Sequence, residues 1–154
     1  MITEADRREI EAAAARVPVR RAAAIDALQI VQKRNGWVSD EDLRAAAGLV
    51  GMTVDELDGL ASFYPMVFRK PVGRHIILFC DSICCWVLGY EKILDRLCSW
   101  LGIRPGETDP EGRFTLLPSP CLGACDRAPA MMVDGDLHGD LTPEGIEAIL
   151  ERYR

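Results

Sequence analysis

Four cysteines in two short segments have the spacing of metal ligands. Cys80 and Cys85 are separated by four residues, and Cys121 and Cys125 by three. An iron–sulfur cluster is held by four cysteine thiolates, and a four-residue gap between ligands occurs in one class of ferredoxins. Each pair fits a loop that wraps one side of a cluster. The sequence therefore predicts a four-thiolate iron–sulfur site.

Other uses of these cysteines fit the sequence less well. Structural zinc sites usually contain a C-x2-C pair, as does a thioredoxin-type dithiol, and neither pair here has that spacing. A Rieske cluster needs two histidine ligands, whereas His75 and His138 are not in Cys-His pairs. Disulfides are typical of small secreted domains with a higher cysteine density. A zinc-stabilised interaction module is the alternative from a different class.

Two further cysteines compete for the four ligand positions. Cys98 lies among leucines on the apolar side of a predicted helix, where a free cysteine acts as a small hydrophobe. Cys84 is harder to exclude, because it adjoins Cys85 and would give the three-residue gap of the later pair if it paired with Cys80. Spacing alone favours Cys85 over Cys84 only modestly.

Charged residues directly follow the cysteine segments. Asp81 follows Cys80, Asp126 follows Cys125, and Arg127 opposes the two acids. A four-thiolate cluster is negatively charged and becomes more so on reduction, so nearby charges shift its reduction potential. The two acids predict a low potential.

Each cysteine pair follows a predicted strand. The apolar run Ile76–Phe79 immediately precedes Cys80, and the run Phe114–Leu117 lies shortly before Cys121. Short apolar runs are typical of strands buried on both faces. If these strands are neighbours, both cysteine loops leave the same edge of the sheet. Gly123 lies within the second pair, where a residue without Cβ easily permits a tight turn.

The remaining elements form a helical first part and a mixed second part. A hydroxyl residue followed three positions later by an acid predicts helix starts at Thr3, Ser39 and Thr53. The other predicted features are helix ends near Pro18, at Gly48 and before Pro65, helices over about Arg20–Asn35 and Tyr90–Leu101, a hairpin of Ala130–Val133 and Asp136–His138, and a last helix opened by Thr142-Pro143. This order indicates a small mixed α/β sheet covered by helices, behind an all-helical segment.

Composition argues against several classes of function. The net charge is −6, so there is no excess of Lys and Arg to neutralise nucleic-acid phosphates, and no polybasic membrane patch. No apolar run approaches the roughly 20 residues of a membrane helix, and the first residues do not resemble a secretory signal. We expect a reducing compartment. The sequence has no G-x-G-x-x-G or Walker-type loop, so we expect this chain not to bind a nucleotide through such a loop.

Several segments of the sequence form a combined pattern: Cys80–Cys85, Gly89-Tyr90, Gly112–Leu117, Cys121–Cys125, Ala128-Pro129 and Leu141–Glu144, together with the aromatic segment Phe63–Phe68. This pattern resembles one protein family, the small 2Fe-2S subunit of bacterial NADH:quinone oxidoreductase, which is respiratory complex I. The resemblance covers nearly the whole chain.

The resemblance implies a fold and a ligand set. The fold is α/β, with an N-terminal helical bundle over residues 1–70 and a thioredoxin-like 2Fe-2S ferredoxin domain over residues 71–154. The first and last cysteine of each motif would hold one 2Fe-2S cluster. This assigns Cys80, Cys85, Cys121 and Cys125 as ligands and leaves Cys84 outside the set.

The resemblance also implies partners. A larger flavoprotein subunit would bind NADH and FMN, and this chain would exchange single electrons with the flavin beside further iron–sulfur subunits. The complex would be cytoplasmic and peripheral to the inner membrane, with no direct insertion by this chain and no catalysis by the chain alone. Subunits of NAD-linked hydrogenases and formate dehydrogenases share the architecture. A free ferredoxin shuttle is disfavoured by the long helical segment.

Overall fold

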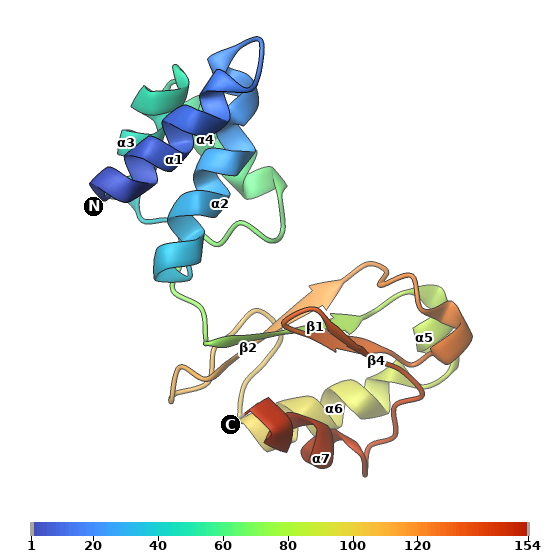
Figure 1. Ribbon diagram of the computed structural model, residues 1–154. Coiled ribbons are helices and arrows are strands. Elements are labelled where there is room, and N and C mark those ends of the chain that lie inside the picture. Colours follow the sequence, from blue (N-terminus) through green and yellow to red (C-terminus); the bar gives the residue numbers. More distant parts are fainter. Residues whose placement is uncertain (1, 154) are drawn as a thin grey trace. The chain divides into compact units, whose positions relative to one another are not determined.

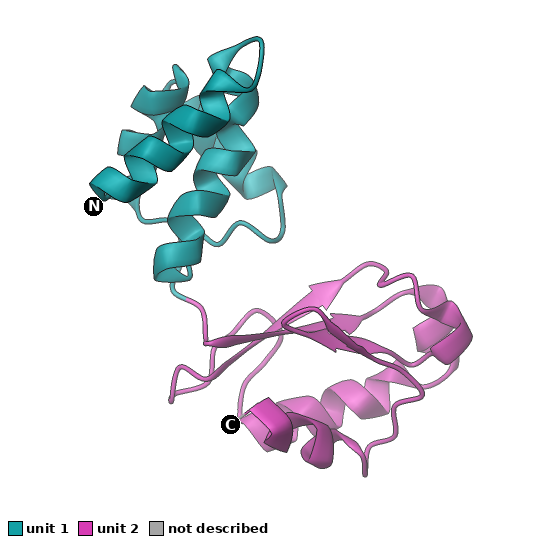
Figure 2. Ribbon diagram, in the orientation of Figure 1, with its two compact units in different colours: residues 1–71 teal, residues 72–154 magenta. Residues whose placement is uncertain are grey.

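The computed structural model describes residues 2–153, which form two compact units (Figure 1). The first unit is Met1–Pro71 and the second is Val72–Arg154, coloured separately in Figure 2. Each unit has its own buried apolar core. Within the described chain, no helix is long and apolar enough to cross a membrane.

Helices alone build the first unit. They are α1 (Glu4–Ala15), the 3-10 helix η1 (Arg20–Ala23), α2 (Ala24–Asn35), α3 (Asp40–Val50) and α4 (Val54–Phe63). The side chains of Thr3, Ser39 and Thr53 cap α1, α3 and α4, which confirms the three predicted helix starts. The core between the helices contains aliphatic side chains, among them Ile10, Leu28, Val31, Leu43 and Leu57.

A largely buried ion-pair network joins three of these helices. Arg34 on α2 contacts Asp6 on α1 through Nε and Oδ2 at 3.1 Å, and Asp42 on α3 through Nη2 and Oδ1 at 3.3 Å. Burial alone would raise the pKa of Asp42, but hydrogen bonds, first of all from Ser39, and nearby positive charge, which includes Arg34, lower it. The stability contributed by ionised Asp42 is therefore lost as pH falls through its lowered pKa.

The predicted end of α3 at Gly48 is wrong. The helix continues to Val50 and ends at Gly51, whose φ of +70° is in the left-handed region. Gly48 is tolerated inside the helix because the neighbouring residues Ala46, Ala47 and Val50 are buried in the core. The segment from Arg20 is also split, since its first four residues form η1 and the α-helix begins at Ala24.

A four-stranded mixed sheet organises the second unit. Its elements are β1 (His75–Cys80), α5 (Ile83–Val87), α6 (Tyr90–Leu101), β2 (Phe114–Ser119), the 3-10 helix η2 (Cys125–Arg127), β3 (Met131–Val133), β4 (Asp136–His138), α7 (Ile146–Leu150) and the 3-10 helix η3 (Glu151–Tyr153). The strand order is β2-β1-β3-β4, with β1 and β2 parallel and the other pairs antiparallel. The predicted hairpin is confirmed as β3 and β4.

Helices α6 and α7 pack against the sheet (Figure 1). Their apolar residues share one core with the sheet, including Leu97 from α6, Ile146 and Leu150 from α7, and Ile77 and Phe114 from the strands. This core fixes β1 and β2 beside each other, and their carboxyl ends are the positions from which the two cysteine segments begin.

Three local predictions differ from the structure. Strand β2 continues through Pro118, which an edge strand tolerates because its missing N–H can face away from the neighbouring strand. Helix α7 begins at Ile146 rather than at Pro143, because Thr142 first forms a turn that accepts the Gly145 N–H. The cysteine loop after β1 contains the helix α5, which the sequence patterns did not predict.

Substitution of the two α3 glycines should have opposite effects on stability. A Cβ at Gly48 meets no atom within 4 Å, so Gly48→Ala should raise the free energy of unfolding by about 1 kcal/mol. Gly51→Ala should lower it, because the left-handed conformation disfavours a Cβ. Urea unfolding of the full chain, followed by far-UV circular dichroism, measures both changes. Equal shifts of one sign would contradict the observed helix end.

Candidate metal centre

The parallel pairing of β1 and β2 brings the two cysteine segments to one edge of the sheet. Cys80 is the last residue of β1 and is paired in register with Ser119, the last residue of β2. Cys121 follows two residues later. The backbone N–H of Asp81 donates to the Ser119 carbonyl oxygen at 3.1 Å, so the two segments are still hydrogen-bonded where they leave the strands. The prediction that both loops leave the same edge is confirmed.

Cys80 and Cys85 form the buried side of the site. Cys80 is 4% exposed, and Cys85, on α5, is 1% exposed. Burial alone would raise the pKa of Cys80, but hydrogen bonds from the Ser82 hydroxyl and from the Ser82 and Leu122 backbones outweigh burial and lower it. Burial, and then the neighbouring Cys80 thiol, raise the pKa of Cys85. The electrostatic environment therefore stabilises a thiolate at Cys80 first.

Cys121 and Cys125 form the exposed side of the site. Gly123 lies between them with a φ of +73°, which confirms the predicted tight turn, and its N–H donates to the Cys121 Sγ at 3.3 Å. Cys125 begins η2. A hydrogen bond with the Cys84 thiol and the charge of that thiol are the main causes that raise the pKa of Cys125 to about 11, with smaller effects of burial and Cys121.

The thiols interact in two groups. The Cys80 thiol raises the pKa of Cys85, and the Cys84 and Cys121 thiols raise the pKa of Cys125. Over residues 2–153 they do not form a preassembled set of three or more metal ligands. The donor chemistry nevertheless fits an iron–sulfur cluster, because the chain supplies thiols at one edge, with the Gly123 N–H and the Ser82 hydroxyl hydrogen-bonded to their sulfur atoms.

The remaining cysteine and the two histidines lie elsewhere in the second unit. Cys98, on α6, packs half-buried against the core, and burial raises the pKa of its thiol. His75 begins β1, at the end of the strand opposite Cys80, and its Nδ1 pairs with Asp134. His138 ends β4 and hydrogen-bonds to Tyr153. These three residues lie away from the cysteine site and have structural partners in the second unit.

An exposed apolar surface adjoins the buried cysteines. It consists of four residues in or directly after α5, namely Ile83, Trp86, Val87 and Leu88, and we call it the α5 patch. Trp86 is 53% exposed and Val87 is 70% exposed. Large apolar side chains gathered on one surface frequently mark an interaction site. Sequence reasoning missed this patch, although the apolar run Trp86–Leu88 directly after the ligand segment was a signal for it.

Charged groups near the site are open to solvent. Asp81 directly follows Cys80, and Asp126 directly follows Cys125. Both acids are exposed. Arg127 pairs with a third acid, because its Nε lies 3.4 Å from the Oδ2 of Asp140. Asp140 therefore offsets part of the Arg127 charge.

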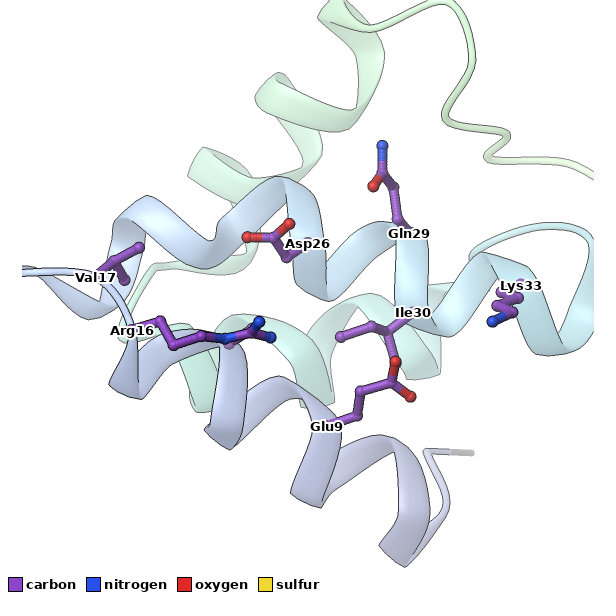
Figure 3. A pocket seen from close by; sticks show the side chains of 8 residues that line it. Glu9, Arg16, Val17, Asp26, Gln29, Ile30 and Lys33 are labelled. Carbon is purple, nitrogen blue, oxygen red and sulfur yellow. The ribbon is translucent and has the colours of Figure 1, made fainter.

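A pocket of about 480 Å³ lies in the first unit between α1 and α2 (Figure 3). Its lining combines acidic residues with basic ones, for example Glu9 and Asp26 with Arg16 and Lys33, and includes no cysteine. Figure 3 shows these side chains around an open groove rather than converging on one point. The residues that line this pocket therefore offer no thiol that could bind a metal.

Two relatives of this chain are subunits of the same kind of oxidoreductase. The chain is 52% identical over 134 residues to an NADH-quinone oxidoreductase subunit of Escherichia coli (strain K12), covering 87% of this chain and 81% of that protein. It is 46% identical over 153 residues to the corresponding NADH-quinone oxidoreductase subunit of Pseudomonas aeruginosa (strain PAO1), covering 99% of this chain and 92% of that protein.

A solved structure extends the similarity to another oxidoreductase. A crystal structure of an NAD+-reducing [NiFe]-hydrogenase in the air-oxidised state matches with a TM-score of 0.69 and 25% identity, over 87% of this chain. The matched part is only 22% of that hydrogenase chain. The pattern of the thioredoxin-like [2Fe-2S] ferredoxin family covers residues 10–154, which include both cysteine pairs. With that match and the identity to both oxidoreductase subunits, this chain belongs to the thioredoxin-like [2Fe-2S] ferredoxin family.

Proposed function

We propose that this chain is an electron-transfer subunit of an NADH:quinone oxidoreductase and carries one 2Fe-2S cluster on Cys80, Cys85, Cys121 and Cys125. The observation that carries the proposal is the meeting of both cysteine segments at one sheet edge. The identity to two NADH-quinone oxidoreductase subunits supports the parent complex. When bound, the cluster accepts and returns one electron at a time.

The residues around the thiols have distinct tasks in this proposal. The N–H of Gly123 and the Ser82 hydroxyl donate to cysteine sulfur, which offsets negative charge at the ligands. Burial of Cys80 and Cys85 excludes water from one side. Asp81 and Asp126 oppose added negative charge and so favour a low reduction potential.

The α5 patch is the surface that we propose for docking of a flavoprotein subunit, which would bind NADH and FMN. Electron exchange requires the partner to approach the cysteines, and the patch lies on the helix that contains Cys85. In the matching hydrogenase, the similar region is a minor part of a much longer chain. The first unit would act as a scaffold for docking, including to further iron–sulfur subunits.

The complex would be cytoplasmic and peripheral to the inner membrane, and the isolated chain would have no NADH oxidation activity. A subunit of an NAD-linked hydrogenase is the second candidate, favoured by the match to the NAD+-reducing enzyme. Purification of the native complex distinguishes the two, since one candidate co-purifies with quinone reductase activity and the other with hydrogenase activity. A zinc-stabilised module would instead be colourless, with zinc and no acid-labile sulfide.

The ligand assignment predicts different outcomes for the adjacent cysteines. Cys85→Ser should lose most of the iron and sulfide, because it removes a buried ligand, whereas Cys84→Ser should retain both. Iron and sulfide analysis with visible absorption of the purified chains measures the difference. Cys98→Ser, on α6, is the control that should resemble wild type. A cluster lost in Cys84→Ser and kept in Cys85→Ser would reverse the assignment.

The docking proposal predicts that Trp86 contributes strongly to partner binding. Trp86→Ala should weaken binding to the flavoprotein subunit by about tenfold to a hundredfold, because exposed tryptophans at interfaces are frequent hot spots. Leu137→Ala, also at an exposed apolar residue of the second unit, is the matched control. Equilibrium binding of cluster-loaded chains tests the pair. Equal affinities of wild type and Trp86→Ala would exclude the α5 patch from the interface.

Removal of one acid should make the cluster easier to reduce. Asp126→Asn removes negative charge beside Cys125 and should raise the reduction potential by a few tens of millivolts, limited by solvent screening. Glu111→Gln changes an exposed acid before β2, at the opposite end from the cysteines, and should leave the potential unchanged. Redox titration by EPR measures both. No upward shift for Asp126→Asn would exclude this acid as a contributor.

A further inference from the structure

Two residues between β4 and α7 lie directly against the short helix η2, which begins at Cys125. They are Gly139 and Asp140, and they contact Arg127, the last residue of η2. The Asp140 N–H donates to the Arg127 carbonyl oxygen at 2.6 Å. The Asp140 carboxylate also pairs with the Arg127 guanidinium. Main-chain and side-chain contacts therefore join this segment to η2.

Gly139 is packed so closely on η2 that a side chain does not fit there. A Cβ at Gly139 would lie 2.6 Å from the Arg127 Cβ and 2.8 Å from the Arg127 carbonyl oxygen. Cβ atoms in proteins essentially never come this close to other heavy atoms, so one of the two segments would have to move. Glycine is needed here for space, because it lets two backbones approach each other closely.

Asp140 has a backbone conformation that is uncommon for a residue with a side chain. Its φ of +53° is in the left-handed region. Such a conformation costs free energy and persists where the surrounding structure holds it. The hydrogen bond and the ion pair with Arg127 are contacts that hold Asp140 in place. Gly139 and Asp140 thus form a fixed segment beside η2.

A hydrogen-bonded turn connects Arg127 to Cys125. The Arg127 N–H donates to the Ala124 carbonyl oxygen at 3.1 Å, so the turn spans Cys125. Further along the same segment, the Cys80 N–H donates to the Ala130 carbonyl oxygen at 3.1 Å. The segment is therefore attached to β1 on one side of η2, and a shift of Arg127 would move Cys125.

We propose that Gly139 and Asp140 are positioning residues of the metal centre, which hold η2 so that the Cys125 sulfur stays in place as a cluster ligand. The proposal rests on the proposed ligand role of Cys125. None of the three residues of η2 is buried, so packing in the core does not fix this short helix. Its contacts with Gly139 and Asp140 supply that restraint, and they act mainly through the backbone.

Two glycine substitutions separate the positioning of Cys125 from a general loss of stability. Gly139→Ala should displace η2, so the EPR g values of the reduced cluster should change and a chelator should remove iron about tenfold faster than from wild type. Gly73→Ala is the matched control, because its Cβ would lie 2.8 Å from backbone atoms of Arg113 and Phe114, at the end of the sheet opposite the cysteines. It should lower the free energy of unfolding and leave the g values unchanged.

Two substitutions of Asp140 test the backbone role independently, including where Gly139→Ala does not fold. Both remove the carboxylate, but glycine adopts a φ of +53° readily and alanine does not. Asp140→Gly should therefore keep the wild-type g values and the wild-type rate of iron loss. Asp140→Ala should lose iron about fivefold faster than Asp140→Gly.

The full chain is used throughout, with far-UV circular dichroism to establish that each variant is folded. Wild-type g values in folded Gly139→Ala, or the same change of g values in Gly73→Ala, would overturn the positioning role. Equal rates of iron loss in Asp140→Gly and Asp140→Ala would overturn the role of the Asp140 backbone. These results leave the proposed function intact, whereas a wild-type chain that binds only zinc would overturn the proposed function and this proposal with it.

Discussion

The parallel pairing of β1 with β2 is the constraint on which the candidate site depends. Parallel strands point their carboxyl ends to the same edge, and these two strands are aligned so that Cys80 is level with Ser119. The pairing is held by the core beneath the sheet, where residues of both strands pack with α6 and α7. Without that register, the two cysteine segments would not begin beside each other at the edge of the sheet. The site is thus a consequence of core packing rather than of its own contacts.

Much of this arrangement could be predicted from the sequence. Capping residues marked the starts of α1, α3 and α4, and the apolar runs before Cys80 and Cys121 predicted the two strands that the structure pairs in parallel. The physical signals are local in each case: a hydroxyl beside free N–H groups, or a short apolar run bounded by breakers. The prediction that the two cysteine loops leave the same edge of the sheet then required only that the two strands be neighbours.

Other features depend on tertiary contacts that no local pattern contains. The sequence predicted that α3 ends at Gly48, but the buried face of the helix continues past it to Val50, and the helix ends at Gly51. Pro118 reads as a strand breaker, but β2 lies at the edge of the sheet and tolerates it. Similarly, spacing separated Cys84 from Cys85 only modestly, whereas their different burial and neighbours distinguish them in the structure.

The two sides of the site differ in their access to water, and this has an electrostatic consequence. The buried thiols already lie in a medium where charges interact strongly, whereas Asp126 and Cys125 are surrounded by solvent. A partner that covers the α5 patch would also exclude water from the exposed Asp81, which lies two residues before α5. Screening of the acidic residues by solvent ions would then weaken, and their effect on added negative charge would grow. In the proposed complex, docking and reduction potential are therefore coupled, because the same surface governs both partner contact and the local dielectric.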